Sequence, residues 1–113
     1  MKNIIITGTS RGIGYELALL FANAGHQVLA LSRNTPKTLI EHQNITCLSV
    51  DLSKEKDLLQ VDNFLKSSWK QIDGLVHNAG SLVMKPFAET TQDDFENVYK
   101  VNVFGVANLT RVC

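Results

Sequence analysis

The sequence has no excess of charge of either sign, few cysteines and no long hydrophobic run, and each absence excludes a class of protein. Eleven basic residues balance eleven acidic ones, so the formal net charge is zero. Nucleic-acid-binding domains usually carry a basic excess, and we therefore expect no nucleic-acid partner. No segment approaches the roughly 20 apolar residues of a membrane span, and the start of the chain lacks the apolar stretch of a signal peptide. These absences predict a soluble, cytoplasmic protein with no membrane partner.

Cys47 and Cys113 are the two cysteines, and they lie far apart in the sequence. Such a pair forms no disulfide framework and has no metal-ligand spacing, which favours a reducing compartment and predicts no metal site. The 113 residues, with 44% apolar and 19% charged side chains, fit one globular domain at most.

Apolar runs and helical apolar stripes alternate along the chain. Short, nearly continuous apolar runs predict four strands, at residues 2–7, 27–31, 45–50 and 72–77. Strands that alternate with helices through short connections form right-handed βαβ units in a parallel sheet. The expected fold class is therefore α/β, a doubly wound parallel sheet of the Rossmann type with about four strands and flanking helices.

The first two helices are predicted between these strands. A stripe of apolar residues with helical spacing predicts the buried face of the first helix, formed by Ile13, Leu17, Leu20, Phe21 and Ala24. Gly25 follows this helix where a left-handed cap would lie. A short helix is expected at residues 36–40.

Two further helices are predicted in the second half of the chain. Ser53 is a good N-cap for a helix that ends near residue 69. The buried stripe of this helix is expected to be Leu58, Val61, Phe64 and Leu65. Thr91 and Asp94 have the spacing of a capping box at the start of the last helix. The apolar face of that helix is expected to be Phe95, Val98, Tyr99, Val106 and Leu109.

A glycine-rich turn, residues 7–14, joins the first strand to the first helix. Gly8 permits the tight turn, Gly12 lets the backbone approach a diphosphate, and Gly14 lets the helix pack close to the sheet. The helix N-terminus presents backbone N–H groups and partial positive charge to phosphates, with Ser10 and Ile13 as further donors. No Gly-Lys-[Ser/Thr] follows, which excludes a nucleoside-triphosphatase loop. The turn therefore predicts a dinucleotide site, the alternative being a turn that binds nothing.

Four motifs in order resemble those of the short-chain dehydrogenase/reductase family, and the resemblance covers the whole chain. They are Thr7-Gly8-x-x-x-Gly12-x-Gly14, Asp51-Leu52, Asn78-Ala79-Gly80, and Asn102 within the last helix. The resemblance implies that Asp51 and Leu52 lie near the adenine, although Asp51 is equally suited to bonding nearby N–H groups of its own turn. It implies that the cofactor lies against Asn78, Ala79 and Gly80, which could also form a simple turn.

Asn102 shares the apolar stripe with Phe95 and Tyr99, so we expect a polar amide on a buried face. A buried amide costs about 1–3 kcal/mol unless it finds partners. By resemblance, Asn102 has a supporting catalytic role and holds a water on a proton path. The alternative is a bond to a backbone carbonyl that stabilises the helix.

The residues at the end of the second strand predict NADP (NADPH) rather than NAD. NAD-selective folds place a carboxylate there, about 20 residues after the glycines, to bind the ribose 2′-hydroxyl. This sequence has Ser32 and Arg33 at that place, and Arg11 adds a second cation in the glycine turn. A guanidinium favours a 2′-phosphate through charge-assisted bonds, whereas Arg33 could also be a solvated loop cation.

The family's catalytic serine and its Tyr-x-x-x-Lys motif are missing from the 113 residues. Leu19 follows Tyr15 and Val103 follows Tyr99 at the fourth position, so neither tyrosine has its lysine. We expect residues 1–113 to be an NAD(P)-binding half-domain that ends inside the helix carrying Asn102, and to be inactive alone. Phe95, Tyr99, Phe104, Val106 and Leu109 would then form an exposed apolar patch.

By resemblance, the parent protein interconverts a small-molecule carbonyl and an alcohol and forms a homo-oligomer. Loop residues 83–87 are candidates for substrate contact. The alternatives are a non-catalytic dinucleotide-binding module and an inactive truncated product. A methyltransferase would have an acidic residue where Ser32 and Arg33 stand, so the sequence disfavours that class.

Overall fold

Four parallel strands form the centre of the molecule. The structure is a computed structural model that describes residues 1–80 and 85–113. The strands are β1 (Asn3–Thr7), β2 (Gln27–Ser32), β3 (Ile45–Ser49) and β4 (Gly74–Val76). Their order in the sheet is β3-β2-β1-β4, and every pair is parallel. The predicted fold class is confirmed.

Strand β4 is shorter than the predicted 72–77. It pairs with β1 in the register Ile5 with Leu75 and then leaves the sheet after Val76. The next backbone N–H groups, those of Asn78 and Ala79, bond to the Thr7 hydroxyl instead of to a strand carbonyl. The side chain of Thr7 therefore ends the strand.

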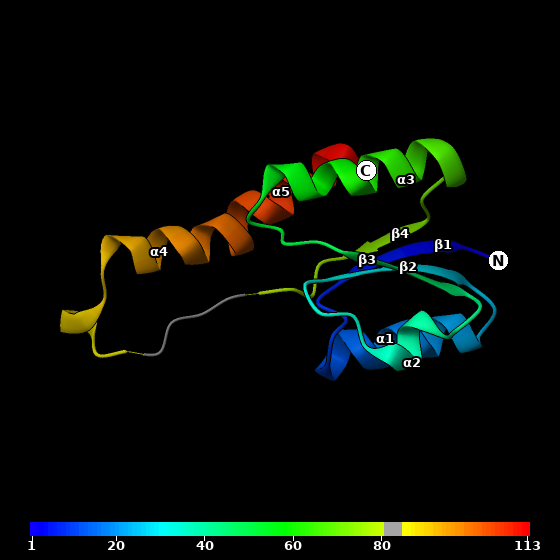
Figure 1. The fold of residues 1–113 in the computed structure, drawn as a ribbon, viewed down its shortest axis with the longest axis horizontal. Coiled ribbons are helices and arrows are strands. Elements are labelled where there is room, and N and C mark those ends of the chain that lie inside the picture. Colours follow the sequence, from blue (N-terminus) through cyan, green and yellow to red (C-terminus); the bar gives the residue numbers. More distant parts are fainter. Residues whose placement is uncertain (81–84) are drawn as a thin grey trace.

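Helices cover both faces of the sheet (Figure 1). Helices α1 (Gly12–Asn23) and α2 (Lys37–Ile40) lie on one face. Helices α3 (Glu55–Ser68) and α5 (Val106–Val112) lie on the other face. Helix α4 (Gln92–Tyr99) projects to one side of the sheet, and the molecule is accordingly elongated, 49 × 26 × 20 Å.

The prediction for the buried face of α1 is wrong. Ile13 and Leu20 are 72% and 64% exposed, and Ala24 is exposed as well. The residues that face the sheet are Gly14, Ala18 and Ala22. Small residues at i, i+4 and i+8 let the helix lie close to the strands, while Leu17 and Phe21 pack at the flank of the contact.

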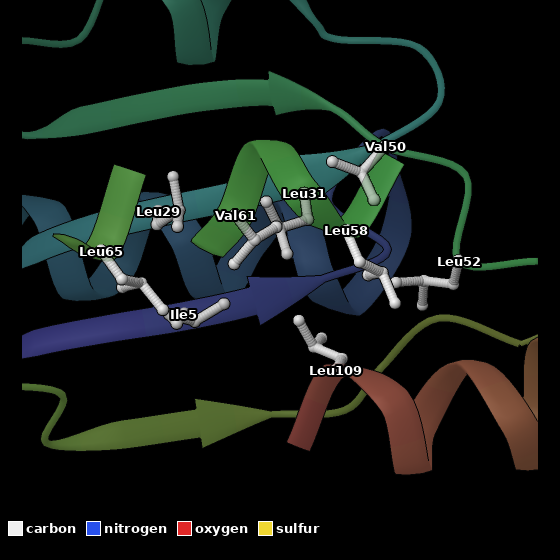
Figure 2. Packing of buried hydrophobic residues seen from close by; sticks show 9 residues of the cluster. All are labelled: Ile5, Leu29, Leu31, Val50, Leu52, Leu58, Val61, Leu65 and Leu109. Carbon is white, nitrogen blue, oxygen red and sulfur yellow. The ribbon is translucent and has the colours of Figure 1, made fainter. Parts of the chain in front are cut away.

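Between the sheet and α3 lies a cluster of buried residues, which Figure 2 shows. Its members are Ile5, Leu29, Leu31, Val50, Leu52, Leu58, Val61, Leu65 and Leu109. The predicted stripe of α3 is confirmed, with Phe64 packed at its edge. The predicted N-cap is wrong: Lys54 occupies that position, and the Ser53 hydroxyl donates to Asp51 instead.

The last predicted helix consists of three segments. Helix α4 begins with the expected capping box of Thr91 and Asp94, preceded by the short 3₁₀ turn η1 (Phe87–Glu89). A wide π-helical segment, η2 (Lys100–Gly105), joins α4 to α5. Leu109 is fully buried and packs in the cluster, which corrects its predicted exposure, and Val106 is half-buried. Phe95, Tyr99 and Phe104 are about half exposed, as expected.

Candidate functional site

A cleft of about 270 Å³ lies where the strands end at their carboxyl ends. Ligands bind at this edge of open α/β sheets, where the strand order reverses. The cleft is lined by Gly8, Ser10, Arg11, Leu31, Ser32, Arg33, Val50, Asp51, Leu52, Asn78, Ala79, Gly80 and Val101. Most of the residues that the sequence singles out thus lie together. Gly12, Ile13 and Gly14 do not line the cleft, and Asn102 is next to it.

Each glycine of the turn has its own structural reason. Gly8 and Gly12 have φ of +71° and +65°, which other residues rarely adopt. A Cβ on Gly8 would lie 2.9 Å from the backbone of Ala79, and a Cβ on Gly14 would overlap the carbonyl oxygen of Gly8. A Cβ on Gly12 would meet nothing within 4 Å, so the backbone there is open to a ligand. The predicted roles of Gly8 and Gly14 match this geometry, and the approach of a diphosphate to Gly12 stays a prediction.

The N-terminus of α1 is suited to an anion. Its N-cap, Arg11, makes no side-chain cap bond, and the first turn contains no acidic residue. The backbone N–H groups and partial positive charge of this turn are therefore not satisfied by a carboxylate or hydroxyl cap. A phosphate would supply acceptors for these groups.

Thr7 fastens the turn after β4 to the end of β1. Its Oγ1 accepts hydrogen bonds from the backbone N–H groups of Asn78 and Ala79, both at 3.0 Å. The Asn78 side chain donates a hydrogen bond in the opposite direction, from Nδ2 to the carbonyl oxygen of Gly8 at 3.1 Å. Asn78 and Ala79 are thereby fixed beside the glycine turn. They lie so close to it that a side chain on residue 8 would collide with the Ala79 backbone.

The two arginines are on the cleft, each at its rim. Arg11 and Arg33 are exposed, and neither forms a salt bridge with a carboxylate among the described residues. Ser32 is 8% exposed, and its hydroxyl donates to the carbonyl oxygen of Asn34 at 2.8 Å. The end of β2 therefore presents positive charge to the cleft and no carboxylate.

Asp51 organises the turn between β3 and α3. Its Oδ1 accepts from the Ser53 hydroxyl at 2.6 Å and from the Ser53 backbone N–H at 2.9 Å, while its own N–H donates to Asp57 Oδ2. The hydrogen bond from the Ser53 hydroxyl is the main cause that lowers the pKa of Asp51, with smaller effects of Lys54 and Arg33. The role of Asp51 as a turn carboxylate is thus present in the structure.

Asn102 is not on a buried face, which corrects the prediction from helical spacing. It is exposed in η2, as are Phe95 and Tyr99 on the same predicted stripe. Helix α4 projects from the sheet, so this stripe has no layer to pack against. Asn102 instead lies beside the cleft, since a Cβ on Gly80 would be 3.6 Å from its Oδ1.

Three lining residues were not predicted: Leu31, Val50 and Val101. Leu31 and Val50 come immediately before the predicted residues Ser32 and Asp51. Their position at the end of a predicted strand could have identified them as lining residues. Val101 adjoins Asn102, but nothing in the sequence shows that η2 approaches the strand ends. Residues 83 and 84 of the proposed substrate loop lie outside the described residues.

Other kinds of site find no support in the described part of the chain. Residues 1–80 and 85–113 contain no group of three or more His, Cys, Asp or Glu side chains that could hold a metal ion. No helix within those ranges is long and apolar enough to cross a membrane. His77 bonds through Nε2 to Thr110 Oγ1 at 2.9 Å, which ties β4 to α5 and supports a structural role.

The sheet order, the glycine turn and the cleft at the strand ends define a doubly wound α/β domain of the nucleotide-binding type. The family model of short chain dehydrogenases matches residues 2–113. The chain therefore belongs to the short-chain dehydrogenase family.

Relatives and solved structures agree with this assignment. The chain is 33% identical to the probable short-chain type dehydrogenase/reductase VdlC of Helicobacter pylori, over 96% of the chain and 41% of the relative. It is 32% identical to the NADPH-dependent 1-acyldihydroxyacetone phosphate reductase of Saccharomyces cerevisiae, over 97% and 39%. A short-chain dehydrogenase of Leptospira borgpetersenii with bound NAD+ superposes with a TM-score of 0.90 at 27% identity, over 98% and 44%. The chain thus spans less than half the length of these proteins.

Proposed function

We propose that this chain is the cofactor-binding part of an NADP-dependent oxidoreductase that interconverts a small-molecule carbonyl and an alcohol. The observation that carries the proposal is the cleft itself, which residues of the glycine turn and two arginines line at the strand ends. Family membership supports the class of reaction. When bound, the nicotinamide supplies the hydride acceptor or donor.

The residues present fit such a cofactor. The first turn of α1 and the open backbone at Gly12 would hold the pyrophosphate, because both leave N–H groups accessible. Ala79 and Gly80 present small side chains to the cleft, so a ring system could lie against their backbone. Asp51 and Leu52 would bound the adenine, and Asn102 would hold a water for proton transfer from its place beside Gly80.

The preference for NADP depends on Arg33 and Arg11. The relatives' names support either cofactor, since the yeast reductase is NADPH-dependent and the Leptospira structure contains NAD+. We therefore base the choice of NADP on the residues at the end of β2. Arg33 would form charge-assisted bonds to the 2′-phosphate, and Ser32, whose hydroxyl is turned to the backbone, adds no repulsion.

Further parts of the proposal rest on family resemblance. The catalytic serine and the Tyr-x-x-x-Lys pair would belong to a part of the parent enzyme other than these 113 residues, which contain no Tyr-x-x-x-Lys. The parent enzyme would be a homo-oligomer, and its cytoplasmic location stays a prediction. A non-catalytic dinucleotide-binding module is the second candidate, because it needs only the cleft; finding a Tyr-x-x-x-Lys elsewhere in the parent protein would eliminate it.

The test is a calorimetric titration of NADPH and NADH onto the protein and onto Arg33→Ala. NADPH should bind the wild type more tightly, and Arg33→Ala should weaken NADPH binding about 10- to 100-fold, the equivalent of one charge-assisted contact. NADH binding should change little. Arg111→Ala, an exposed arginine on α5 that does not line the cleft, is the matched control. Equal affinities, or an NADH preference that Arg33→Ala leaves unmoved, would contradict the proposal.

A further inference from the structure

Gly105 forms the contact between the helical segment beside the cleft and the turn after β3. It is buried at the end of η2. A Cβ built on it would lie 2.9 Å from both the Cβ and the carbonyl oxygen of Leu52, and 3.1 Å from the carbonyl oxygen of Lys100. Real Cβ atoms are essentially never found as close as the Leu52 contacts. Any other residue would therefore have to push the helix and the turn apart.

The requirement for glycine here is one of space and not of backbone conformation. Gly105 has φ −60° and ψ −44°, values that every residue adopts in a helix. This distinguishes it from Gly8 and Gly12, which have positive φ. The atoms that a Cβ would meet include two backbone carbonyl oxygens, which cannot move aside as a flexible side chain could.

The contact also fixes the separation of two walls of the cleft. Leu52 lines the cleft from the turn after β3, and Val101 lines it from η2. Val101 is one turn before Gly105 in the same π-helical segment. A displacement of η2 away from Leu52 would carry Val101 with it and widen the cleft between them.

These walls stand on the side of the cleft where the proposed cofactor would place its adenosine. In NADP the 2′-phosphate is on the adenosine ribose, so a phosphate bound by Arg33 puts the adenosine near the ends of β2 and β3. Leu52 follows β3 and lines the same cleft. We propose that Gly105 is a positioning residue that sets the width of the cleft on its adenosine side; this inference rests on the proposed function.

The test is titration of adenosine 2′,5′-bisphosphate onto the wild type and Gly105→Ala by calorimetry. The Kd should rise about fivefold with unchanged stoichiometry, the equivalent of roughly 40 Å² of lost apolar contact. A purely structural role would instead reduce the fraction of protein that binds, seen as lower stoichiometry with an unchanged Kd. Gly74→Ala is the matched control, because its Cβ would meet Ile4 at an ordinary 3.8 Å; it should leave the Kd unchanged.

If Gly105→Ala does not fold, Val101→Ala can be tested instead, because it shortens a side chain that lines the cleft without adding an atom. It should produce a similar rise in Kd. A Kd within about twofold of wild type for either folded variant overturns the inference, as does a loss of stoichiometry alone for Gly105→Ala. Failure of the wild type to bind adenosine 2′,5′-bisphosphate would overturn the proposed function as well.

Discussion

Thr7 connects the end of β1 to the turn after β4 through one side-chain atom. Its Oγ1 accepts from two backbone N–H groups whose residues lie 71 and 72 positions further along the chain. The side chain is 1% exposed, so water has little access to replace it. The hydroxyl of a strand-end threonine thus determines where Asn78 and Ala79 stand relative to the glycine turn.

We expect Thr7→Val to lower the free energy of unfolding by about 1–3 kcal/mol, because the isosteric change leaves two N–H donors without their acceptor. Urea denaturation measures the change. Thr7→Ser, which keeps the hydroxyl, is the control and should retain most of the stability. A Thr7→Val protein as stable as the Thr7→Ser protein would show that the two bonds contribute nothing net.

At the scale of the element, the turn between β3 and α3 differs from its prediction in which residue caps the helix. Ser53 has the residue type and position of an N-cap, but its hydroxyl donates to the Asp51 carboxylate and Lys54 occupies the cap. A serine has several local acceptors within reach, and the choice among them follows from the path of the chain. Here the carboxylate, a charged acceptor, forms the stronger bond.

The lowered pKa of Asp51 predicts an effect of Ser53 on acid stability. A carboxyl whose folded pKa is lowered adds stability above about pH 4, where aspartate is ionised in the unfolded chain, and this stability is lost as the pH falls toward the folded pKa. Ser53→Ala should therefore reduce the loss of unfolding free energy between neutral pH and about pH 3. Denaturant unfolding at a series of pH values measures it, with Ser68→Ala, an exposed serine at the end of α3, as control. An unchanged pH dependence would contradict the assignment.

The segment that follows Thr91 shows a second limit of local patterns. The capping box was predictable because both of its bonds are made within three residues. The π-helical segment η2 was not, since a stripe with a period of 3.6 residues assumes a regular α-helix. Asn102 is exposed and Leu109 is fully buried, because α5 packs in the core cluster whereas α4, on the other side of η2, projects from the sheet.

At the scale of the whole molecule, α4 and η2 form an apolar groove on the part of the chain that projects from the sheet. The groove has a volume of about 420 Å³ and is lined by Phe95, Glu96, Tyr99, Lys100 and Phe104. Within the described residues, strand β4 is also an edge of the sheet, with β1 as its one neighbour. Exposed apolar surface and unpaired strand edges both favour association.

We expect the 113-residue chain to self-associate, and the double substitution Phe95→Ser and Phe104→Ser to weaken this association about tenfold or more, because each phenylalanine contributes apolar area to the groove. Sedimentation velocity over a range of concentrations measures it. Phe87→Ser, which removes an aromatic that is 85% exposed and outside the groove, is the control. A wild-type chain that stays monomeric at all concentrations would contradict the prediction.

The sequence by itself determined the alternation of strands and helices, the glycine turn and the capping box of α4, because each depends on neighbours a few positions away. Most of the residues that line the cleft could be predicted from their places at strand ends, since these meet at one edge of a parallel sheet. The alternation of strands and helices also determined the parallel sheet. Only the tertiary structure decided that Ala18 and Ala22 face the sheet, that Thr7 holds Asn78, and that Gly105 lies against Leu52. These contacts join residues up to 71 positions apart or depend on how closely two elements pack, and local periodicity contains no information about either.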